Sequence, residues 1–388
     1  MPAQISNKGL ATVKELYNEK GKRAKELKEQ GKKIIGYFCA YPPVELITAA
    51  GLVPYRIMGR LKEPITEADK YLETIACPFI RSCLDTALKG DYDFLEGVVV
   101  PHSCDNVIRL YDIWTYNMKP SFKHCINIPH MMHPSSYEFL KMEMLTFKKS
   151  LENLIGGVIS NQQLRDAIQL HNEVRGLVRQ LYDLRKQDPP LISGSEFTQL
   201  LVAGVTIPAQ EHKELLKSVI DEVATRNEHP KKKDIRVLVC GPVIDDTAFI
   251  DLIEESGAYV VMDDLCFGSR MYWHDVEMTD DPFDGLVVRY LEKLVCPRTY
   301  KGRPAERTYE EDLEFRFGYL GDFVREFNVN GVIIYIIRFC DIHELDLPDV
   351  RDYLKGKGLS VLHLEDDYTL ASIAGLRTRV QAFLEMIH

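Results

Sequence analysis

The sequence predicts an α/β protein with two Rossmann-like or flavodoxin-like units, each built on a parallel sheet, joined by a helical segment. Near-continuous hydrophobic runs rich in β-branched residues, such as 97–100 and 331–337, are typical of parallel strands buried on both faces. Stretches with helical periodicity separate these runs. Strands that alternate with helices pair in parallel through right-handed crossovers.

The first third of the chain divides into a helical segment and a sheet domain. Residues 1–33 are expected to form an N-terminal helical segment, because apolar side chains recur at helical spacing over residues 8–32. Residues 34–134 are expected to form a first α/β domain. Its strands are placed at 34–39, 53–57, 98–100 and 125–128. A helix after the first strand is indicated by Pro42 and Pro43, which suit its start, and by Gly51, which suits its end.

The rest of the chain is expected to form a helical connector and a second sheet domain. Residues 135–230 carry helix-forming sequence, broken near 188–190 and 193–194, and predict the connector. Residues 231–388 predict the second α/β domain. Its strands are placed at 235–240, 259–262, 332–339 and 359–364. Cys39 and Cys240 each close the first strand of their half, and Cys104 and Cys340 each close a later strand, which indicates a duplicated architecture.

Composition limits the classes of function. The chain has 388 residues and a formal net charge of -10, which argues against a nucleic-acid partner because such partners require a basic face. The N-terminus lacks the apolar core of a signal peptide, and no run reaches the roughly 18 apolar residues of a membrane span. We therefore expect a cytoplasmic protein with no membrane association. Nine cysteines without a secretion signal do not indicate a disulfide framework, and the absence of any Cys-x-x-Cys pair argues against a zinc ribbon.

Three cysteines stand where a functional edge is expected. Cys104 and Cys340 follow predicted buried strands, and open α/β folds bind their ligands at the carboxyl ends of their strands. Cys77 lies before Pro78 at a third position. Thiolates that converge from distant parts of a chain are typical ligands of a metal cluster.

Several blocks of sequence resemble one family, the 2-hydroxyacyl-CoA dehydratase and benzoyl-CoA reductase superfamily. The similar segments are Gly-Tyr-Phe-Cys-Ala-Tyr-Pro-Pro-Val-Glu-Leu at 36–46, Ala-Ala-Gly-Leu-Val-Pro at 49–54, Pro-His-Ser-Cys-Asp at 101–105, Arg-Phe-Cys-Asp at 338–341, and Arg-Thr-Arg-Val-Gln-Ala-Phe-Leu-Glu at 377–385. They occur in the family's order and extend from about residue 32 to the end of the chain.

The resemblance implies an iron–sulfur enzyme subunit. Members carry one [4Fe–4S] cluster held by three cysteines, and the family's ligand motifs fall on Cys77, Cys104 and Cys340. It also implies a homologous second subunit, in a heterodimer or heterotetramer, and a separate ATP-hydrolysing iron–sulfur activator that injects one electron. The electron would convert an acyl-CoA or aromatic CoA thioester into a ketyl radical. The sequence has no GxxxxGK[ST] phosphate loop, so ATP hydrolysis is expected to belong to the activator.

Within the superfamily we favour a benzoyl-CoA reductase type that reduces an aromatic ring. One alternative is an (R)-2-hydroxyacyl-CoA dehydratase subunit, which eliminates water. Another is a reductase of small molecules with a double-cubane cluster, for which Cys39 is a possible additional ligand. The last is a cluster-free scaffold or maturation partner. The number of iron atoms per chain separates a single cubane from a double one.

The other polar and sulfur-bearing candidates have structural interpretations as well. His102 and Ser103 are candidates for catalytic proton transfer or for capping the next helix. Asp105, Asp341 and Glu45 are expected to have structural roles near helix starts. Arg377 and Arg379 are candidates for CoA phosphate contacts or for pairing with Glu385. Six cysteines are expected to be small buried hydrophobic residues, namely Cys39, Cys83, Cys125, Cys240, Cys266 and Cys296.

Overall fold

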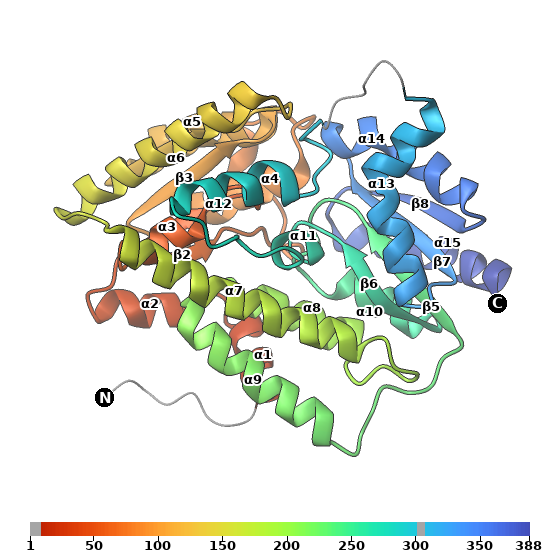
Figure 1. The fold of residues 1–388 in the computed structure, drawn as a ribbon. Coiled ribbons are helices and arrows are strands. Elements are labelled where there is room, and N and C mark those ends of the chain that lie inside the picture. Colours follow the sequence, from red (N-terminus) through yellow and green to blue (C-terminus); the bar gives the residue numbers. More distant parts are fainter. Residues whose placement is uncertain (1–8, 301–306) are drawn as a thin grey trace.

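Two four-stranded parallel sheets form the frame of the protein (Figure 1). The computed structural model describes residues 9–300 and 307–388. The first sheet has the order β2-β1-β3-β4, with β1 (Ile34–Tyr37), β2 (Val53–Arg56), β3 (Gly97–His102) and β4 (Phe122–Asn127). The second has the order β6-β5-β7-β8, with β5 (Ile235–Cys240), β6 (Ala258–Asp264), β7 (Gly331–Ile337) and β8 (Ser360–Asp366). The predicted fold class is confirmed, and the two sheets repeat one connectivity.

Helices cover both faces of each sheet, and a separate helical layer lies beneath the two sheets (Figure 1). The helices around the first sheet are α3 (Val44–Ala49), α4 (Pro78–Leu88), α5 (Asp105–Met118) and α6 (Pro134–Ile155). Those around the second are α10 (Ala248–Glu255), α11 (Ser269–Tyr272), α13 (Tyr309–Glu326), α14 (Asp341–Gly356) and α15 (Ile373–Ile387). The helical layer contains α1 (Gly9–Asn18), α2 (Lys22–Glu29), α7 (Asn161–Leu184), α8 (Gly194–Gly204) and α9 (Ala209–Thr225). Short helical turns are η1 (Ala68–Lys70) and η3 (Leu370–Ser372).

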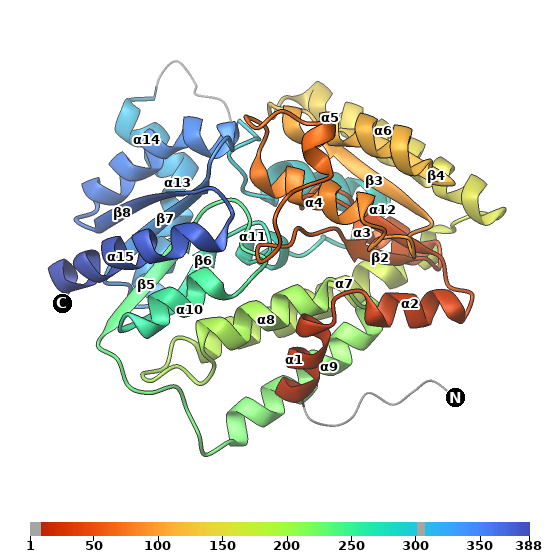
Figure 2. The same ribbon diagram turned by 180° about the vertical axis from the view of Figure 1, so that it is seen from behind.

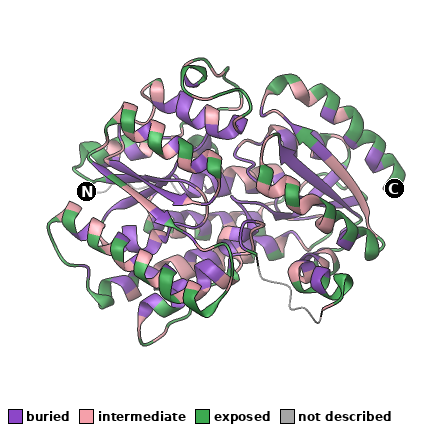
Figure 3. Ribbon diagram, turned by 90° about the horizontal axis from the view of Figure 1, so that it is seen from above, coloured by how far each residue is buried: buried purple, intermediate pink, exposed green. Residues whose placement is uncertain are grey.

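Alternate residues of the central strands enter different hydrophobic cores. Val98 and Val100 of β3 pack with residues of α4 and α5, whereas Val99 packs with residues of α3 and α6. The second sheet follows the same rule, with α10 and α15 on one face and α13 and α14 on the other, as the view from behind shows (Figure 2). Burial of the strands on both faces (Figure 3) explains why they read as hydrophobic runs in the sequence.

Two segments differ from the simplest reading of the sequence. The helix expected over residues 8–32 is instead two helices, α1 and α2, because Gly21 takes a left-handed conformation with φ of 90° and redirects the chain. α6, which begins the expected connector, packs against β4 of the first sheet. The proposed domain boundaries at 33/34, 134/135 and 230/231 stay a prediction.

One segment of the second half returns to the first sheet. After α11 the chain forms α12 (Pro282–Val287) and η2 (Val288–Lys293), a π-helical turn. Phe283, Leu286 and Leu291 are buried in the same core as Ile35 of β1 and Phe147 of α6. The two halves of the molecule are therefore interleaved along the chain.

Across residues 9–300 and 307–388, no helix combines the length and the apolar character that crossing a membrane requires.

Glu45 connects three of these elements from inside the protein. Its side chain is fully buried at the start of α3, forms an ion pair with Arg175 of α7, and accepts a hydrogen bond of 2.8 Å from Tyr290 Oη of η2. Burial alone would raise the pKa of Glu45, but the electrostatic influence of the Arg175 guanidinium, with a smaller one from His171, lowers it to about 2. The carboxylate therefore has the structural role that its position in the helix predicts.

We expect Glu45→Gln to destabilise the fold in a pH-dependent way. At pH 7 the variant should lose about 3 kcal/mol of unfolding free energy, because Arg175 becomes an unpaired buried charge. The folded-state pKa of Glu45, about 2, lies below its ordinary value of 4.5. The ion pair therefore contributes stability above pH 4.5 and loses it as the pH falls toward 2. In urea unfolding, the difference in unfolding free energy between the variant and the wild type should be smaller at pH 3 than at pH 7. The exposed Glu29→Gln is the control, and a difference that is independent of pH would contradict this assignment.

Candidate functional site

The carboxyl ends of both sheets face one cavity of about 290 Å³. Six of the nine cysteines line it, and the rest of its wall is largely apolar, with Phe38, Phe79 and Ile80 among its residues. The cysteines are Cys39, Cys77, Cys104, Cys266, Cys296 and Cys340. The structure thus brings together the three predicted ligands, the possible fourth and two further thiols.

The duplicated fold explains where most of these thiols come from. Cys39, Cys104, Cys266 and Cys340 lie just after the carboxyl ends of β1, β3, β6 and β7. Cys77 precedes α4 on the connection that leaves β2, and Cys296 follows η2 on the returning segment. Cys39 and Cys240 have corresponding positions in the two halves of the sequence, but only Cys39 lines this cavity. Cys240 is the last residue of β5 itself and lines a neighbouring pocket instead.

Each of the three predicted ligands stands at the start of a helix. Cys77, Cys104 and Cys340 occupy the N-cap positions of α4, α5 and α14, respectively. The N-terminus of a helix carries about half a positive charge and unpaired N–H groups, which favour an anion there. Three such ends converge on the cavity, an arrangement that stabilises thiolates.

Asn106 connects the segments that carry these three cysteines. Its Oδ1 accepts a hydrogen bond of 3.0 Å from the backbone N–H of Cys77, and its Nδ2 donates a long one of 3.5 Å to the carbonyl oxygen of Phe339. Asn106 itself lies two residues after Cys104, and Phe339 directly precedes Cys340. One side chain in the first turn of α5 therefore fixes the spacing of all three N-caps.

Two residues of the cavity wall have a left-handed backbone. Cys39 has φ of 61° and Phe339 has φ of 64°, values that cost non-glycine residues about 1 to 3 kcal/mol. The backbone N–H of Phe339 donates to Glu344 Oε1 at 3.1 Å, which holds this conformation. Such strain concentrates at functional sites, since it aims the following residues in a direction that regular structure does not allow.

Burial favours the neutral form of the thiols in this cavity. Burial raises the pKa of Cys77 to about 11, and nearby N–H groups of Phe79 and Ile80 only partly oppose it. Burial likewise raises the pKa of Cys104 and of Cys296 to about 12. The pKa of Cys340 rises well above its ordinary value for the same reason, and the neighbouring sulfurs of Cys77 and Cys104 add to the effect. Thiolates at these positions therefore need a metal ion or another strong electrophile.

Arginines surround the thiols that the sequence motifs do not mark. Arg270 Nη1 lies 3.6 Å from Cys266 Sγ, and Arg298 is an electrostatic neighbour of Cys39 and Cys296. Arg298 also donates to the carbonyl oxygens of His102 and Pro129, at 2.9 and 2.5 Å, and to that of Ile128. Arg56 is 1% exposed and lines the cavity as well. The cavity wall thus carries the guanidiniums of Arg56 and Arg298, opposed by the carboxylates of Asp105 and Asp341.

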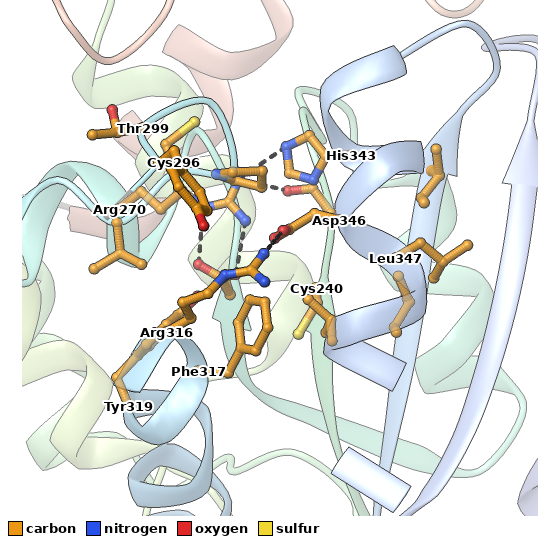
Figure 4. Close-up of a pocket in the computed structure, with 18 residues that line it drawn as sticks. Cys240, Arg270, Cys296, Thr299, Arg316, Phe317, Tyr319, His343, Asp346 and Leu347 are labelled. Atoms are coloured by element: carbon orange, nitrogen blue, oxygen red, sulfur yellow. Dashed lines mark hydrogen bonds and ion pairs between the residues drawn. The ribbon is translucent and has the colours of Figure 1, made fainter. Parts of the chain in front are cut away.

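A smaller pocket of about 60 Å³ shares Cys296 and His343 with this cavity (Figure 4). His343 Nε2 lies 3.2 Å from Arg270 Nη1. Because a guanidinium only donates, Nε2 accepts and the proton of the neutral ring is on Nδ1. Burial lowers the pKa of His343 well below its ordinary value, and Arg270 adds to this. Arg270 is itself held by Asp264 through hydrogen bonds of 2.9 and 2.7 Å.

The polar residues predicted beside Cys104 have different positions. Ser103 is buried and lines the cavity, whereas His102, the last residue of β3, is not among the lining residues. Neither residue caps α5, since the N-cap position belongs to Cys104. His130 and His343 line the cavity and were not singled out from the sequence. Proton transfer by His102 or Ser103 stays a prediction.

Other candidate residues have ordinary structural partners. Asp105 and Asp341 occupy the first turns of α5 and α14, as expected for carboxylates that favour a helix start. Arg377 pairs with Glu255 at 2.8 Å, and Arg379 donates to the carbonyl oxygen of His363 at 2.7 Å, so neither pairs with Glu385.

Cys83 is fully buried in α4, and Cys125 is half-buried in β4.

Cys266 and Cys296 are the functional candidates that sequence reasoning assigned to packing. Cys266 is 9% exposed and belongs to a hydrophobic core, yet its side chain also lines the cavity. A sequence signal existed for Cys266, because it follows a predicted buried strand just as Cys104 and Cys340 do. Cys296 had none, since it lies on a loop whose return to the first sheet depends on tertiary packing.

The thiols at this cavity are of the ligand type that iron–sulfur clusters use. Within residues 9–300 and 307–388, no three His, Cys, Asp or Glu side chains are grouped closely enough for one metal ion. The thiolates of an iron–sulfur cluster bind separate irons and stand further apart. Soft sulfur ligands and a largely apolar wall fit such a cluster.

Comparison with known proteins identifies the family. A family model described as "2-hydroxyglutaryl-CoA dehydratase, D-component" matches residues 39–387, and the chain belongs to this family. The chain is 28% identical to a subunit of benzoyl-CoA reductase from Thauera aromatica, over 84% of this chain and 83% of that one. It is 25% identical to the (R)-phenyllactyl-CoA dehydratase beta subunit of Clostridium sporogenes, over 94% of each chain. It is also 25% identical to the beta subunit of (R)-2-hydroxyglutaryl-CoA dehydratase of Acidaminococcus fermentans, over 93% of this chain and 94% of that one.

We expect Asn106→Ala to loosen the cysteine segments while the fold persists. The variant leaves the Cys77 N–H and the Phe339 carbonyl without their partner, at a cost of about 1 to 3 kcal/mol. Alkylation of Cys77 in the metal-free protein, followed by mass spectrometry, should become several-fold faster. Asn117→Ala on the same helix removes a hydrogen bond of 2.8 Å to the carbonyl oxygen of Ile113, remote from the cysteine segments, and serves as the matched control. Equal alkylation rates in both variants would rule out the bridging role of Asn106.

Proposed function

We propose that this member of the 2-hydroxyglutaryl-CoA dehydratase D-component family holds iron–sulfur clusters in the six-cysteine cavity and acts as a low-potential, one-electron reductase. The observation that carries the proposal is the meeting of six cysteines from six separate segments at one largely apolar cavity. Iron–sulfur clusters supply electrons one at a time, over a range of potentials that reaches very low values.

The number of thiols favours a double-cubane cluster. In the family that the sequence resembles, three cysteines hold one cubane, and Cys77, Cys104 and Cys340 fall on those motifs. Cys39, Cys266 and Cys296 offer a second set of three ligands at the same cavity. This supports a reductase of small molecules, because a larger cluster leaves less of the 290 Å³ for the acyl group of a CoA thioester.

The second candidate is an acyl-CoA enzyme subunit with one cubane, of the benzoyl-CoA reductase type or the 2-hydroxyacyl-CoA dehydratase type. Its support comes from the relatives, which are named as subunits of such reductases and dehydratases. Under this proposal Cys266 and Cys296 do not bind metal. The count of iron atoms per chain therefore decides between the two candidates.

The residues of the chain provide the environment that either reaction needs. Phe38, Phe79 and Ile80 exclude water from the thiols, which protects strongly reducing species from side reactions. The N-termini of α4, α5 and α14 stabilise negative charge on the sulfurs. The neutral His343 carries a proton on Nδ1, and Ser103 carries one on its hydroxyl, so both residues of the wall are hydrogen-bond donors that can orient a reduced substrate.

The proposal includes partners. The relatives are named as single subunits of larger enzymes, two of them as beta subunits, which supports assembly with a second, homologous subunit. The chain has no phosphate loop in its sequence. A separate activator ATPase is therefore proposed as the source of the energised electron.

Iron content of variants tests the ligand assignment. Anaerobically isolated wild type should contain about eight irons per chain, as two [4Fe–4S] units require. Cys104→Ser and Cys340→Ser should lose much of the iron, since a hydroxyl is a poor ligand for it. Cys266→Ser and Cys296→Ser should reduce it to about four. Cys83→Ser and Cys240→Ser are matched controls that should keep full iron and cost about 1 to 3 kcal/mol of stability. About four irons in the wild type, unchanged in Cys266→Ser, would favour the acyl-CoA candidate.

Activity should require an activator. The isolated chain is expected neither to hydrolyse ATP nor to turn over substrate with ATP alone. Turnover should appear when an iron–sulfur activator ATPase and a low-potential electron donor are added. Parallel assays with benzoyl-CoA, a 2-hydroxyacyl-CoA and small reducible molecules identify the substrate class. ATP-dependent turnover by the chain without any activator would refute this division of labour.

A further inference from the structure

Arg56 is a buried cation without an anion. It is the last residue of β2, it is 1% exposed, and it lines the six-cysteine cavity. Its Nε and Nη1 have no hydrogen-bond partner within the described residues. Burying a charged group with unused donors is costly, so a bound group that accepts from Arg56 would remove a large penalty.

Several other buried arginines of the described chain have a carboxylate partner or a set of carbonyl acceptors, although Arg185 and Arg289 also keep guanidinium nitrogens without a hydrogen-bond partner. Arg175 pairs with Glu45, and Arg270 pairs with Asp264. Arg289 donates to three backbone carbonyl oxygens, those of His274, Arg270 and Met271. Arg56 forms no ion pair with any carboxylate in the described part of the chain. Its Nε and Nη1 therefore keep unused donor capacity at the wall of the cavity.

The immediate surroundings of Arg56 fix the guanidinium but do not neutralise it. The guanidinium carbon lies 4.8 Å from the centre of the Phe267 ring and 5.4 Å from that of Tyr37. Arg56 acts electrostatically on Tyr37, Tyr272, Cys83 and Cys266, all of which are neutral in their ordinary states. Of these, only Cys266 also lines the cavity. A thiolate at Cys266 would place a negative charge within the electrostatic reach of Arg56 at the cavity.

We propose that Arg56 is the counter-cation of an anionic cluster bound on the Cys266 side of the cavity. Its free N–H groups donate to sulfur there, and the guanidinium raises the reduction potential of the cluster. The physical reason is that an added electron makes the cluster more negative, so a fixed positive charge stabilises the reduced form more than the oxidised form. This inference rests on the proposed function, because it assumes that iron and sulfide occupy the cavity.

The inference predicts different consequences of Arg56→Met for the iron-free and the iron-loaded protein. In iron-free protein, Arg56→Met removes an uncompensated buried charge and should raise the melting temperature. In iron-loaded protein, the same change removes the counter-cation and should shift the midpoint potential to a more negative value. Arg56→Lys keeps the charge but loses the planar fork of N–H donors. The midpoint potential of this iron-loaded variant should therefore lie between that of the wild type and that of Arg56→Met. Thermal melts of both states and a redox titration followed by absorbance measure these effects.

Arg289→Met is the matched control, since Arg289 is similarly buried, donates to three carbonyl oxygens and lies outside the cavity, although its Nη1 has no partner within the described residues. It should lower the melting temperature in both states and leave the potential unchanged. A lower melting temperature for iron-free Arg56→Met, or an unchanged potential in loaded Arg56→Met, would overturn the role of Arg56. Absence of iron from the anaerobic wild type would overturn the proposed function itself, and the role of Arg56 would fall with it.

Discussion

Three helices of this protein begin at one cavity, and each has a cysteine at its N-cap position. Bringing three positive helix ends and the guanidiniums of Arg56 and Arg298 into one poorly solvated space is unfavourable unless negative charge compensates them. Asp105 and Asp341, in the first turns of two of these helices, supply part of that charge. Deprotonated thiols would supply the rest, and thiols become anions in such surroundings when a metal replaces their protons. The charge balance of the whole site thus depends on what the sulfurs bind.

The repeated sheet explains how one fold assembles six thiols without a local cysteine motif. Each half presents the carboxyl ends of its strands to the same space, so single cysteines after β1, β3, β6 and β7 become neighbours. The duplication is imperfect at the first strand of each half. Cys39 lies beyond the end of β1 and reaches the cavity, whereas Cys240 still belongs to β5 and faces the adjoining pocket. Cys296, from the returning segment, supplies the sixth thiol.

The sequence predicted the strands well because both faces of each sheet are buried, and burial on both faces leaves a hydrophobic run that local reading detects. It also predicted that Cys77, Cys104 and Cys340 would meet, through strand ends and through family motifs. It could not place Cys296 or Arg56 at the cavity, since Cys296 depends on a loop crossing between the halves and Arg56 looks like an ordinary strand-end residue. The two hydrogen bonds of Asn106 could not be predicted either, because its partners are 29 and 233 residues away in the sequence.

The segment that returns to the first sheet, α12 and η2, also determines whether the protein can be divided into independent fragments. Phe283, Leu286 and Leu291 complete the core beneath the first sheet, although they follow β5 and β6 in the chain. A fragment that ended near residue 230 would therefore expose one face of that sheet, and the remaining fragment would carry an apolar helix with nothing to cover it. Chimeras that exchange halves with a relative face the same obstacle. The entire chain, rather than either of its two similar halves, is therefore the unit that should be expressed or engineered.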